Sequence, residues 1–350
     1  MISTIEDLPP ALAASVTLDE RNHIAEIRRR GLLPFAVTRH FASLALPDPD
    51  DPIRRQFFPD PREAIPDPIA LDDPLGESLH RAAPCLVHQY RNRALLLAAR
   101  ACAGYCRHCF RRVWVSGGGS PDQGPRPGDL GAALDYLAAR PEIREVLVSG
   151  GDPLTMDNDR LADLFRRLRA ARPGLVLRLC TRVPITEPSR LDGETVAMLA
   201  AFRPLWISAH INHSRELSAE SRDALASCVD AGIAVKVQTV LLRGVNDDPA
   251  TLAGLFRECL DLGLSPYYLF QLDLAPGTAH FRVPLERGLA VYRGLRGLIP
   301  DPPTYAVDLP GGGGKVALHE NIVAGERKSD RGTEYVIRDK NGREWYYPAV

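Results

Sequence analysis

Three cysteines lie close together in the stretch "CAGYCRHC", at Cys102, Cys106 and Cys109. The chain has seven cysteines, an odd number without the spacing of a disulfide framework, so the clustered ones are expected to bind metal. A structural zinc ion normally takes four protein ligands, whereas three thiolates can hold a [4Fe-4S] cluster whose remaining iron keeps an exchangeable ligand. We therefore expect a [4Fe-4S] cluster at this loop. A zinc site completed by His108 or a more distant cysteine stays open as the alternative.

One lysine, Lys315, follows four glycines in "DLPGGGGKVAL". The stretch is not a phosphate-binding P-loop, because Leu309 and Val316 stand where that loop needs a glycine and a hydroxyl residue. A lysine on a loop that allows close approach, inside a partly dry cavity, would have a lowered pKa and be competent to form a Schiff base. We expect pyridoxal 5′-phosphate (PLP) to supply the aldehyde. A flexible glycine linker is the alternative interpretation.

The elements that must position these residues alternate regularly along the chain. Short apolar runs recur roughly every 30 residues with helical patterns between them, which predicts a parallel sheet covered by helices. Successive runs end on polar residues, as expected where barrel strands deliver side chains to one rim. We predict an α/β fold, specifically a partial (β/α)6 TIM-like barrel. Its strands are expected at residues 94–99, 145–151, 175–182, 205–211, 234–242 and 267–274.

The flanking segments differ in composition from this central part. Residues 1–88 are rich in proline and aspartate and are predicted to form an irregular N-terminal wrap with one helix near residues 18–30. The barrel is expected over residues 89–310, and a C-terminal extension with the lysine loop and a hairpin over residues 311–350. Asn341-Gly342 favours a type I′ turn in that hairpin.

The overall charge and hydropathy limit the classes of partner. The formal net charge is -1, which gives no general attraction to nucleic acid or anionic membrane. No stretch approaches the roughly 18 consecutive apolar residues of a membrane span. We therefore expect a cytoplasmic protein with a small-molecule partner and neither a nucleic-acid nor a membrane partner.

The combination of "YCRHCFRR" with "DLPGGGGK" closely resembles the lysine 2,3-aminomutase family, the PLP-dependent branch of the radical S-adenosylmethionine (SAM) enzymes. The likeness runs from about residue 44 to residue 325 and includes "DPLGE", "LWISAHINH", "VQTVLLRGVNDD" and "YYLFQLDLAPGTAHFRVPLERG". The resemblance implies a radical SAM barrel and an isomerase that moves an α-amino group to the β carbon. It also implies a [4Fe-4S] cluster, SAM and PLP as cofactors, with flavodoxin or ferredoxin as the external electron donor. A homodimer is a further expectation.

The resemblance also assigns roles to residues at matching positions. It implies that Lys315 binds PLP, that Arg111 binds the substrate carboxylate and that Arg93 contacts the cofactor phosphate. The family's companion of Arg93 is replaced by Gln89, so we expect the phosphate contact to be built differently here. The "SGGD" stretch is expected to orient the methionine part of SAM, with a simple tight turn as the alternative, and two further residues are expected near the deoxyadenosyl group. These residues are Ser149, Gly150, Gly151 and Asp152, and His210 and Gln238.

Two aspartates, Asp273 and Asp308, bear on the substrate. By resemblance they surround the side-chain ammonium of lysine, and relatives that act on glutamate carry other residues there. Buried carboxylates repel each other and are costly to ionise unless a cation joins them, which favours a cationic substrate. L-Lysine is the expected substrate and L-β-lysine the product. Arginine, or a lysine on elongation factor P, is the alternative within this chemistry, and a zinc-held interaction module is the alternative outside it.

Overall fold

The computed structural model describes residues 1–115, 127–318, 323–329, 332–338 and 344–348. Its centre is a sheet whose strands pair in sequence order from β1 to β10. Strands β3 to β9 run parallel, while β1, β2 and β10 are antiparallel additions at the two edges. The strands are β1 (Arg81–Ala83), β2 (Leu86–Tyr90), β3 (Arg93–Ala99), β4 (Glu145–Gly150), β5 (Val176–Thr181), β6 (Leu205–His210), β7 (Ala234–Leu241), β8 (Ser265–Gln271), β9 (Thr304–Leu309) and β10 (Gly314–Ala317).

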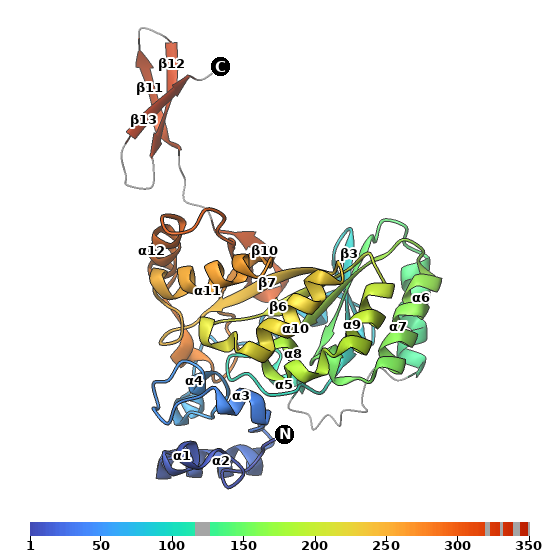
Figure 1. Ribbon diagram of the computed structural model, residues 1–350. Coiled ribbons are helices and arrows are strands. Elements are labelled where there is room, and N and C mark those ends of the chain that lie inside the picture. Colours follow the sequence, from blue (N-terminus) through green and yellow to red (C-terminus); the bar gives the residue numbers. More distant parts are fainter. Residues whose placement is uncertain (116–126, 319–322, 330–331, 339–343, 349–350) are drawn as a thin grey trace.

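A helix follows each of the first six parallel strands, and Figure 1 shows α7, α9, α10 and α11 along one face of the curved sheet. The capping side chains Asp157, Asp192, Ser218 and Asp248 each accept a backbone N–H at the start of one of these four helices. The partial (β/α)6 barrel is therefore confirmed. Strand β9 is a further parallel strand, which the sequence analysis did not predict. The six helices are α6 (Pro127–Ala138), α7 (Asn158–Ala171), α9 (Gly193–Ala201), α10 (Ala219–Asp230), α11 (Pro249–Asp261) and α12 (Leu285–Arg296).

Side-chain alternation along the strands separates the core from the cavity. In β3, Leu96 and Ala98 are buried on the helix side, while Arg93 and Leu95 line the cavity inside the barrel. Apolar side chains of the helices complete the core between the sheet and its helical cover. Polar, aromatic and aliphatic side chains line the interior together.

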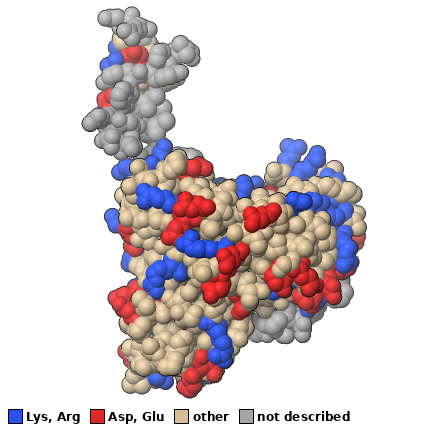
Figure 2. Space-filling view, in the orientation of Figure 1, with Lys and Arg blue, Asp and Glu red and all other residues tan. Residues whose placement is uncertain are grey.

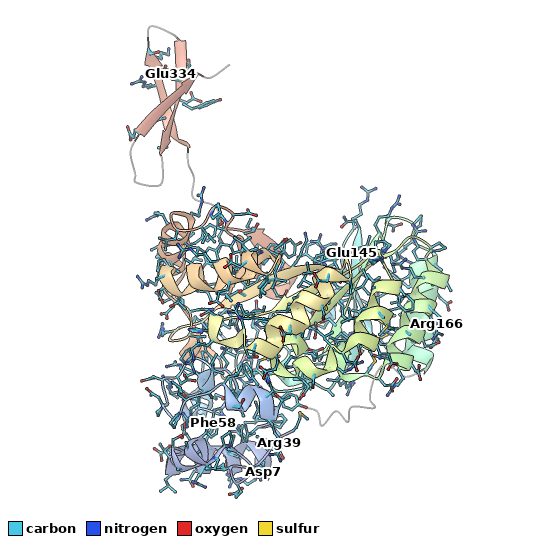
Figure 3. All side chains as sticks on the ribbon, in the orientation of Figure 1. Asp7, Arg39, Phe58, Glu145, Arg166 and Glu334 are labelled. Carbon is cyan, nitrogen blue, oxygen red and sulfur yellow. The ribbon has the colours of Figure 1, made fainter. Side chains whose placement is uncertain are left out.

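The N-terminal segment covers the end of the sheet where the parallel strands finish. Figure 3 shows Phe58 of this segment at one end of the molecule, and Glu145, the first residue of β4, lies away from it. The predicted helix near residues 18–30 is confirmed as α2, which begins at a capping box formed by Thr17 and Glu20. The remaining short elements are α1 (Pro10–Ala14), α2 (Leu18–Arg30), α3 (Arg39–Ser43), α4 (Arg54–Phe57), η1 (Pro61–Ala64), η2 (Glu77–His80), α5 (Arg112–Val115), η3 (Pro153–Thr155), α8 (Val183–Thr186), η4 (Pro188–Arg190), η5 (Ser214–Glu216), η6 (Ala279–Phe281) and η7 (Pro310–Gly312).

A separate three-stranded antiparallel sheet ends the chain. It consists of β11 (Val323–Ser329), β12 (Gly332–Arg338) and β13 (Glu344–Pro348), and Figure 1 shows it standing apart from the barrel. The pairing of β12 with β13 confirms the predicted hairpin, whose turn at Asn341-Gly342 lies outside the described residues. The division at residues 88 and 310 stays a prediction, and the main sheet continues across both positions.

Acidic and basic side chains are mixed on the face drawn in Figure 2, in keeping with the near-zero net charge. Among the described residues, no helix has both the length and the apolar character that a membrane crossing requires.

Candidate active site

One cavity of about 320 Å³ lies at the carboxyl ends of the parallel strands and reaches into the barrel. It is lined by every residue that the sequence analysis assigned to the site. The cysteine loop and Lys315 therefore face the same chamber, although more than two hundred residues separate them in sequence. The assigned lining residues are Arg93, Cys102, Cys106, Cys109, Arg111, Ser149, Gly150, Gly151, Asp152, His210, Gln238, Asp273, Asp308 and Lys315.

The cysteine loop follows β3 and is fastened to the N-terminal segment by backbone hydrogen bonds. The N–H of Tyr105 donates to the carbonyl of Ala36 at 2.9 Å, and that of Arg107 to the carbonyl of Gln56 at 2.8 Å. All three thiols are free, and burial raises the pKa of Cys109 to about 11 and that of Cys102 well above its usual value. Thiols with raised pKa values become thiolates when a metal binds them.

Among the described side chains, no three metal-ligating groups converge on the position of a single ion. A cluster makes no such demand, because each of its three thiolates binds a different iron. Two buried polar atoms beside the loop, Nε of Arg182 and Nδ1 of His108, have no hydrogen-bond partner among the described residues. The loop therefore offers three sulfur ligands and unpaired nitrogens to a group that fills this end of the cavity.

The "SGGD" stretch ties the ends of three strands together. Gly150 has a φ of 113°, and a Cβ atom there would lie 2.3 Å from the carbonyl oxygen of Ala99 at the end of β3. The close approach that only glycine allows is thus made to the protein's own backbone. The buried carboxylate of Asp152 accepts hydrogen bonds from Thr181 Oγ1 and the Arg182 N–H, both at 2.7 Å. Asp152 accordingly fixes the end of β5, while Ser149 accepts a hydrogen bond from Arg111 at 3.2 Å.

The glycine run before Lys315 is an ordered turn between antiparallel strands. Gly311, Gly312 and Gly314 have φ values of 70°, 84° and 81°, in the left-handed region that favours glycine. The amide of Gln89 donates to the carbonyl of Gly312 at 3.0 Å and holds the turn against β2. Within the part of the chain that the structure describes, this stretch is a strand connection rather than a flexible linker.

Lys315 lies opposite Asp308 in the pairing of β10 with β9. Its Nζ is 2.7 Å from Oδ2 of Asp308 and 4.0 Å from the ring centroid of Phe270. Its backbone N–H donates to the hydroxyl of Tyr90 at 2.8 Å. Carboxylate, aromatic ring and backbone contact together point the amine into the cavity.

Asp273 faces the same part of the cavity. Burial and the nearby carboxylate of Asp308 raise the pKa of Asp273 to about 7. Lys315 and Arg111 act against this rise, but they do not cancel it. The pair of aspartates is thus a place where an additional cation is electrostatically favoured.

Arg111, the predicted carboxylate ligand, already has an internal carboxylate partner. Its Nη2 and Nε donate to Glu77 at 2.6 and 3.0 Å, and its Nη1 donates to Ser149. Sequence reasoning gave Glu77 no role, although it closes the "DPLGE" motif. A carboxylate that binds Arg111 in this cavity must therefore share the guanidinium with Glu77 or displace Glu77.

The remaining predicted residues line the cavity with neutral or cationic groups. Nε2 of His210 is 3.0 Å from Oδ1 of Asn212, and burial together with Arg182 lowers the pKa of His210 to about 3, so its ring is neutral near pH 7. Gln238 Oε1 accepts a hydrogen bond from Ser208 at 3.2 Å. The Arg93 guanidinium lies 4.1 Å from the ring centroid of Tyr90.

The chain is similar over most of its length to L-lysine 2,3-aminomutases of several bacteria. It is 37% identical over 325 residues to L-lysine 2,3-aminomutase of Clostridium subterminale, which covers 92% of this chain and 76% of the relative. It is 34% identical over 350 residues to L-lysine 2,3-aminomutase of Bacillus subtilis, covering 99% of this chain and 72% of the relative. The chain belongs to the lysine 2,3-aminomutase family. No family model matches it.

Family membership makes the protein an isomerase of the lysine 2,3-aminomutase type, with a [4Fe-4S] cluster, SAM and PLP as cofactors. The donor sets in the cavity fit these groups, since three thiols stand beside unpaired nitrogens and a lysine amine stands on a rigid turn. The family also contains a glutamate 2,3-aminomutase of Clostridioides difficile, 33% identical over 326 residues, covering 92% of this chain and 75% of the relative. The lysine 2,3-aminomutase family therefore includes more than one substrate, and the side chains in the cavity must decide between them.

Sequence reasoning missed a buried carboxylate that organises the cysteine loop. Glu63 accepts hydrogen bonds from Arg107 Nε at 2.7 Å and from Arg112 Nη2 at 2.5 Å, and its side chain is only 3% exposed. In "YCRHCFRR", Arg107 lies between two of the cluster cysteines and Arg112 follows the last of them. The two arginines suggest that an acidic residue pairs with them once the loop is buried. Nothing in the sequence identifies Glu63 as that residue.

Proposed function

We propose that the protein is a radical SAM, PLP-dependent 2,3-aminomutase that converts free L-lysine to L-β-lysine. The observation that carries the choice of substrate is the pair Asp273 and Asp308, which face one cavity and repel each other. A substrate with a cationic side-chain tip relieves this repulsion, whereas a glutamate side chain would add a third negative charge.

Three residues of the cavity bind the two charged ends of the substrate. Asp273 and Asp308 receive the ammonium at the end of the substrate side chain, and Arg111 receives the carboxylate. A guanidinium suits that task because its N–H groups form a fork that matches a carboxylate. Holding both ends of the substrate fixes the carbon chain between them, so that the β hydrogen has one position in the cavity.

When bound, the cofactors would supply a deoxyadenosyl radical for hydrogen transfer and an aldehyde for the migrating nitrogen. Lys315 would hold the aldehyde through its amine. Its neighbours Phe270 and Tyr268, whose ring centroids lie 4.0 and 5.3 Å from Nζ, exclude water from that side of the amine. Neutral His210 and Gln238 present no charge to a carbon radical.

Further parts of the proposal concern partners and location. We infer a one-electron donor such as flavodoxin or ferredoxin, because the reductive cleavage of SAM consumes an electron. All seven cysteines are free in the structure, which suits the reducing cytoplasm. A homodimer stays a prediction that sedimentation of the anaerobically purified protein tests.

The deciding experiment is a substrate survey. The protein is reconstituted anaerobically with iron, sulfide and PLP, then incubated with SAM, dithionite and one amino acid at a time: L-lysine, L-arginine, L-glutamate or a lysine-bearing elongation factor P. Derivatised products are separated and weighed by mass spectrometry. We expect a β isomer from L-lysine, and a β isomer from glutamate alone would overturn the proposal. Product from arginine or elongation factor P alone would keep the chemistry but replace the substrate.

A further inference from the structure

Arg182 follows β5 and touches the cysteine loop directly. Its Nη1 donates to the sulfur of Cys106 at 2.7 Å. Among the described residues, no side chain donates a hydrogen bond to the sulfur of Cys102 or Cys109, so Cys106 differs from the other two cysteines of the triplet. The three thiols therefore have unequal surroundings before any metal binds.

The position of Arg182 is fixed from several sides. Its Nη2 donates to Gln56 Oε1 at 2.5 Å and lies 3.3 Å from Oε1 of Glu216, a fully buried carboxylate. Its backbone N–H is held by Asp152, and its guanidinium lies 5.0 Å from the ring centroid of Phe41. The side chain is only 8% exposed. A cation so enclosed has no freedom to leave the sulfur and little water to screen it.

We propose that Arg182 is a positioning residue that raises the reduction potential of the iron-sulfur cluster through its hydrogen bond to Cys106. The inference rests on the proposed function only in assuming a cluster at the three cysteines. Arg182 neither transfers an electron nor forms a covalent bond. The external donor loses one electron and the cluster gains it, so the reduced cluster carries one more negative charge.

The direction of the effect follows from that charge. A hydrogen bond from a cation to a cluster thiolate stabilises electron density on the sulfur, and therefore stabilises the reduced form more than the oxidised form. The bond is present in both oxidation states, so only its strengthening in the reduced cluster shifts the potential. Loss of the bond should therefore lower the ratio of reduced to oxidised cluster by up to about tenfold, which for one electron is about 59 mV.

The test compares the midpoint potentials of reconstituted proteins by dithionite titration followed with electron paramagnetic resonance. Arg182→Gln should titrate up to about 59 mV below the wild-type protein. Arg182→Lys, which keeps the charge but loses the fork, should lie between them. The matched control is Arg190→Gln, because the Arg190 guanidinium is likewise held by hydrogen bonds, to the carbonyls of Leu154 and Met156, but makes no bond to the cysteine loop. An unchanged potential in Arg182→Gln, with a full complement of iron and sulfide, overturns the inference.

A second measurement uses the wild-type protein and so does not depend on whether a variant folds. Protein labelled with ¹⁵N-arginine is reduced, and pulsed electron paramagnetic resonance is used to look for a coupled arginine nitrogen. Such a coupling is expected from Nη1 of Arg182 at hydrogen-bond distance from a cluster thiolate. Its absence in the wild-type protein contradicts the inference even if Arg182→Gln assembles no cluster. Absence of any cluster in the wild-type protein would refute the proposed function itself, which keeps the two failures distinct.

Discussion

Lys315 and Asp308 are cross-strand neighbours whose Nζ and Oδ2 atoms lie 2.7 Å apart. The lysine ammonium therefore sits beside one of two carboxylates that repel each other, since Asp308 also raises the pKa of Asp273. An amine that held the cofactor aldehyde would no longer act as that free ammonium. The ammonium of a lysine substrate then becomes the cation that the aspartates require, so cofactor loading and substrate selectivity depend on the same pair of strands.

Substitution of Lys315 by alanine should abolish turnover, because no other described lysine lines the cavity to hold the cofactor. Borohydride reduction followed by peptide mass spectrometry should find the PLP adduct on Lys315 in the wild-type protein and on no residue of Lys315→Ala. Lys328→Ala, an exposed change on β11, is the control and should keep both label and activity. Turnover that persists in Lys315→Ala would show a radical enzyme that works without this lysine.

The aspartates should act on binding more than on chemistry. Asp273→Asn and Asp308→Asn each remove one charge facing the substrate ammonium and should raise KM for lysine about tenfold to a hundredfold, the range for hydrogen bonds to charged groups. The value of kcat should change less in Asp273→Asn than in Asp308→Asn, since Asp308 also contacts the amine of Lys315. Steady-state kinetics under anaerobic conditions gives both constants, and an unchanged KM in both variants would remove the basis for a cationic substrate.

Lysine affinity should depend on pH through Asp273. Because burial and Asp308 raise the pKa of this carboxyl to about 7, it is increasingly protonated below that pH and loses the charge that attracts the ammonium. The Kd for lysine should therefore rise by up to about tenfold for each pH unit below 7 and level off above it. Equilibrium dialysis between pH 5 and 8 measures this, and the slope should vanish in Asp273→Asn.

The strand ends were predictable because period and polarity are local properties of a sequence. Apolar runs at a regular spacing predicted six of the parallel strands, and their polar ends predicted the rim where His210 and Gln238 lie. Strand β9 was not predicted, because the proline and glycines that follow it are typical of a loop. The glycine run was likewise ambiguous until its pairing with β9 showed an ordered turn.

The contacts that hold the site in place could not be predicted, because they join residues far apart in sequence. Gln56 lies in the irregular N-terminal segment, yet it bonds to both Arg182 and Asn212 beneath the cluster loop. Glu77 was visible as part of a motif, but its pairing with Arg111 depends on how the N-terminal segment folds back over the strand ends. Such partners follow from packing, and residue type alone left dozens of candidates.

Glu63 offers the sharpest test of that packing. Arg107 and Arg112 lower the pKa of Glu63 to about 2 despite its burial. The ionised carboxylate therefore stabilises the fold fully above the unfolded pKa of 4.5, and this stabilisation is lost as the pH falls toward 2. Glu63→Gln leaves two buried cations uncompensated and should cost about 3–5 kcal/mol at pH 7 in urea unfolding, with the difference shrinking below pH 4.5. Glu26→Gln, which breaks an exposed pair with Arg29, should cost no more than about 1 kcal/mol. Equal losses in the two variants would mean that Glu63 does not anchor the cysteine loop.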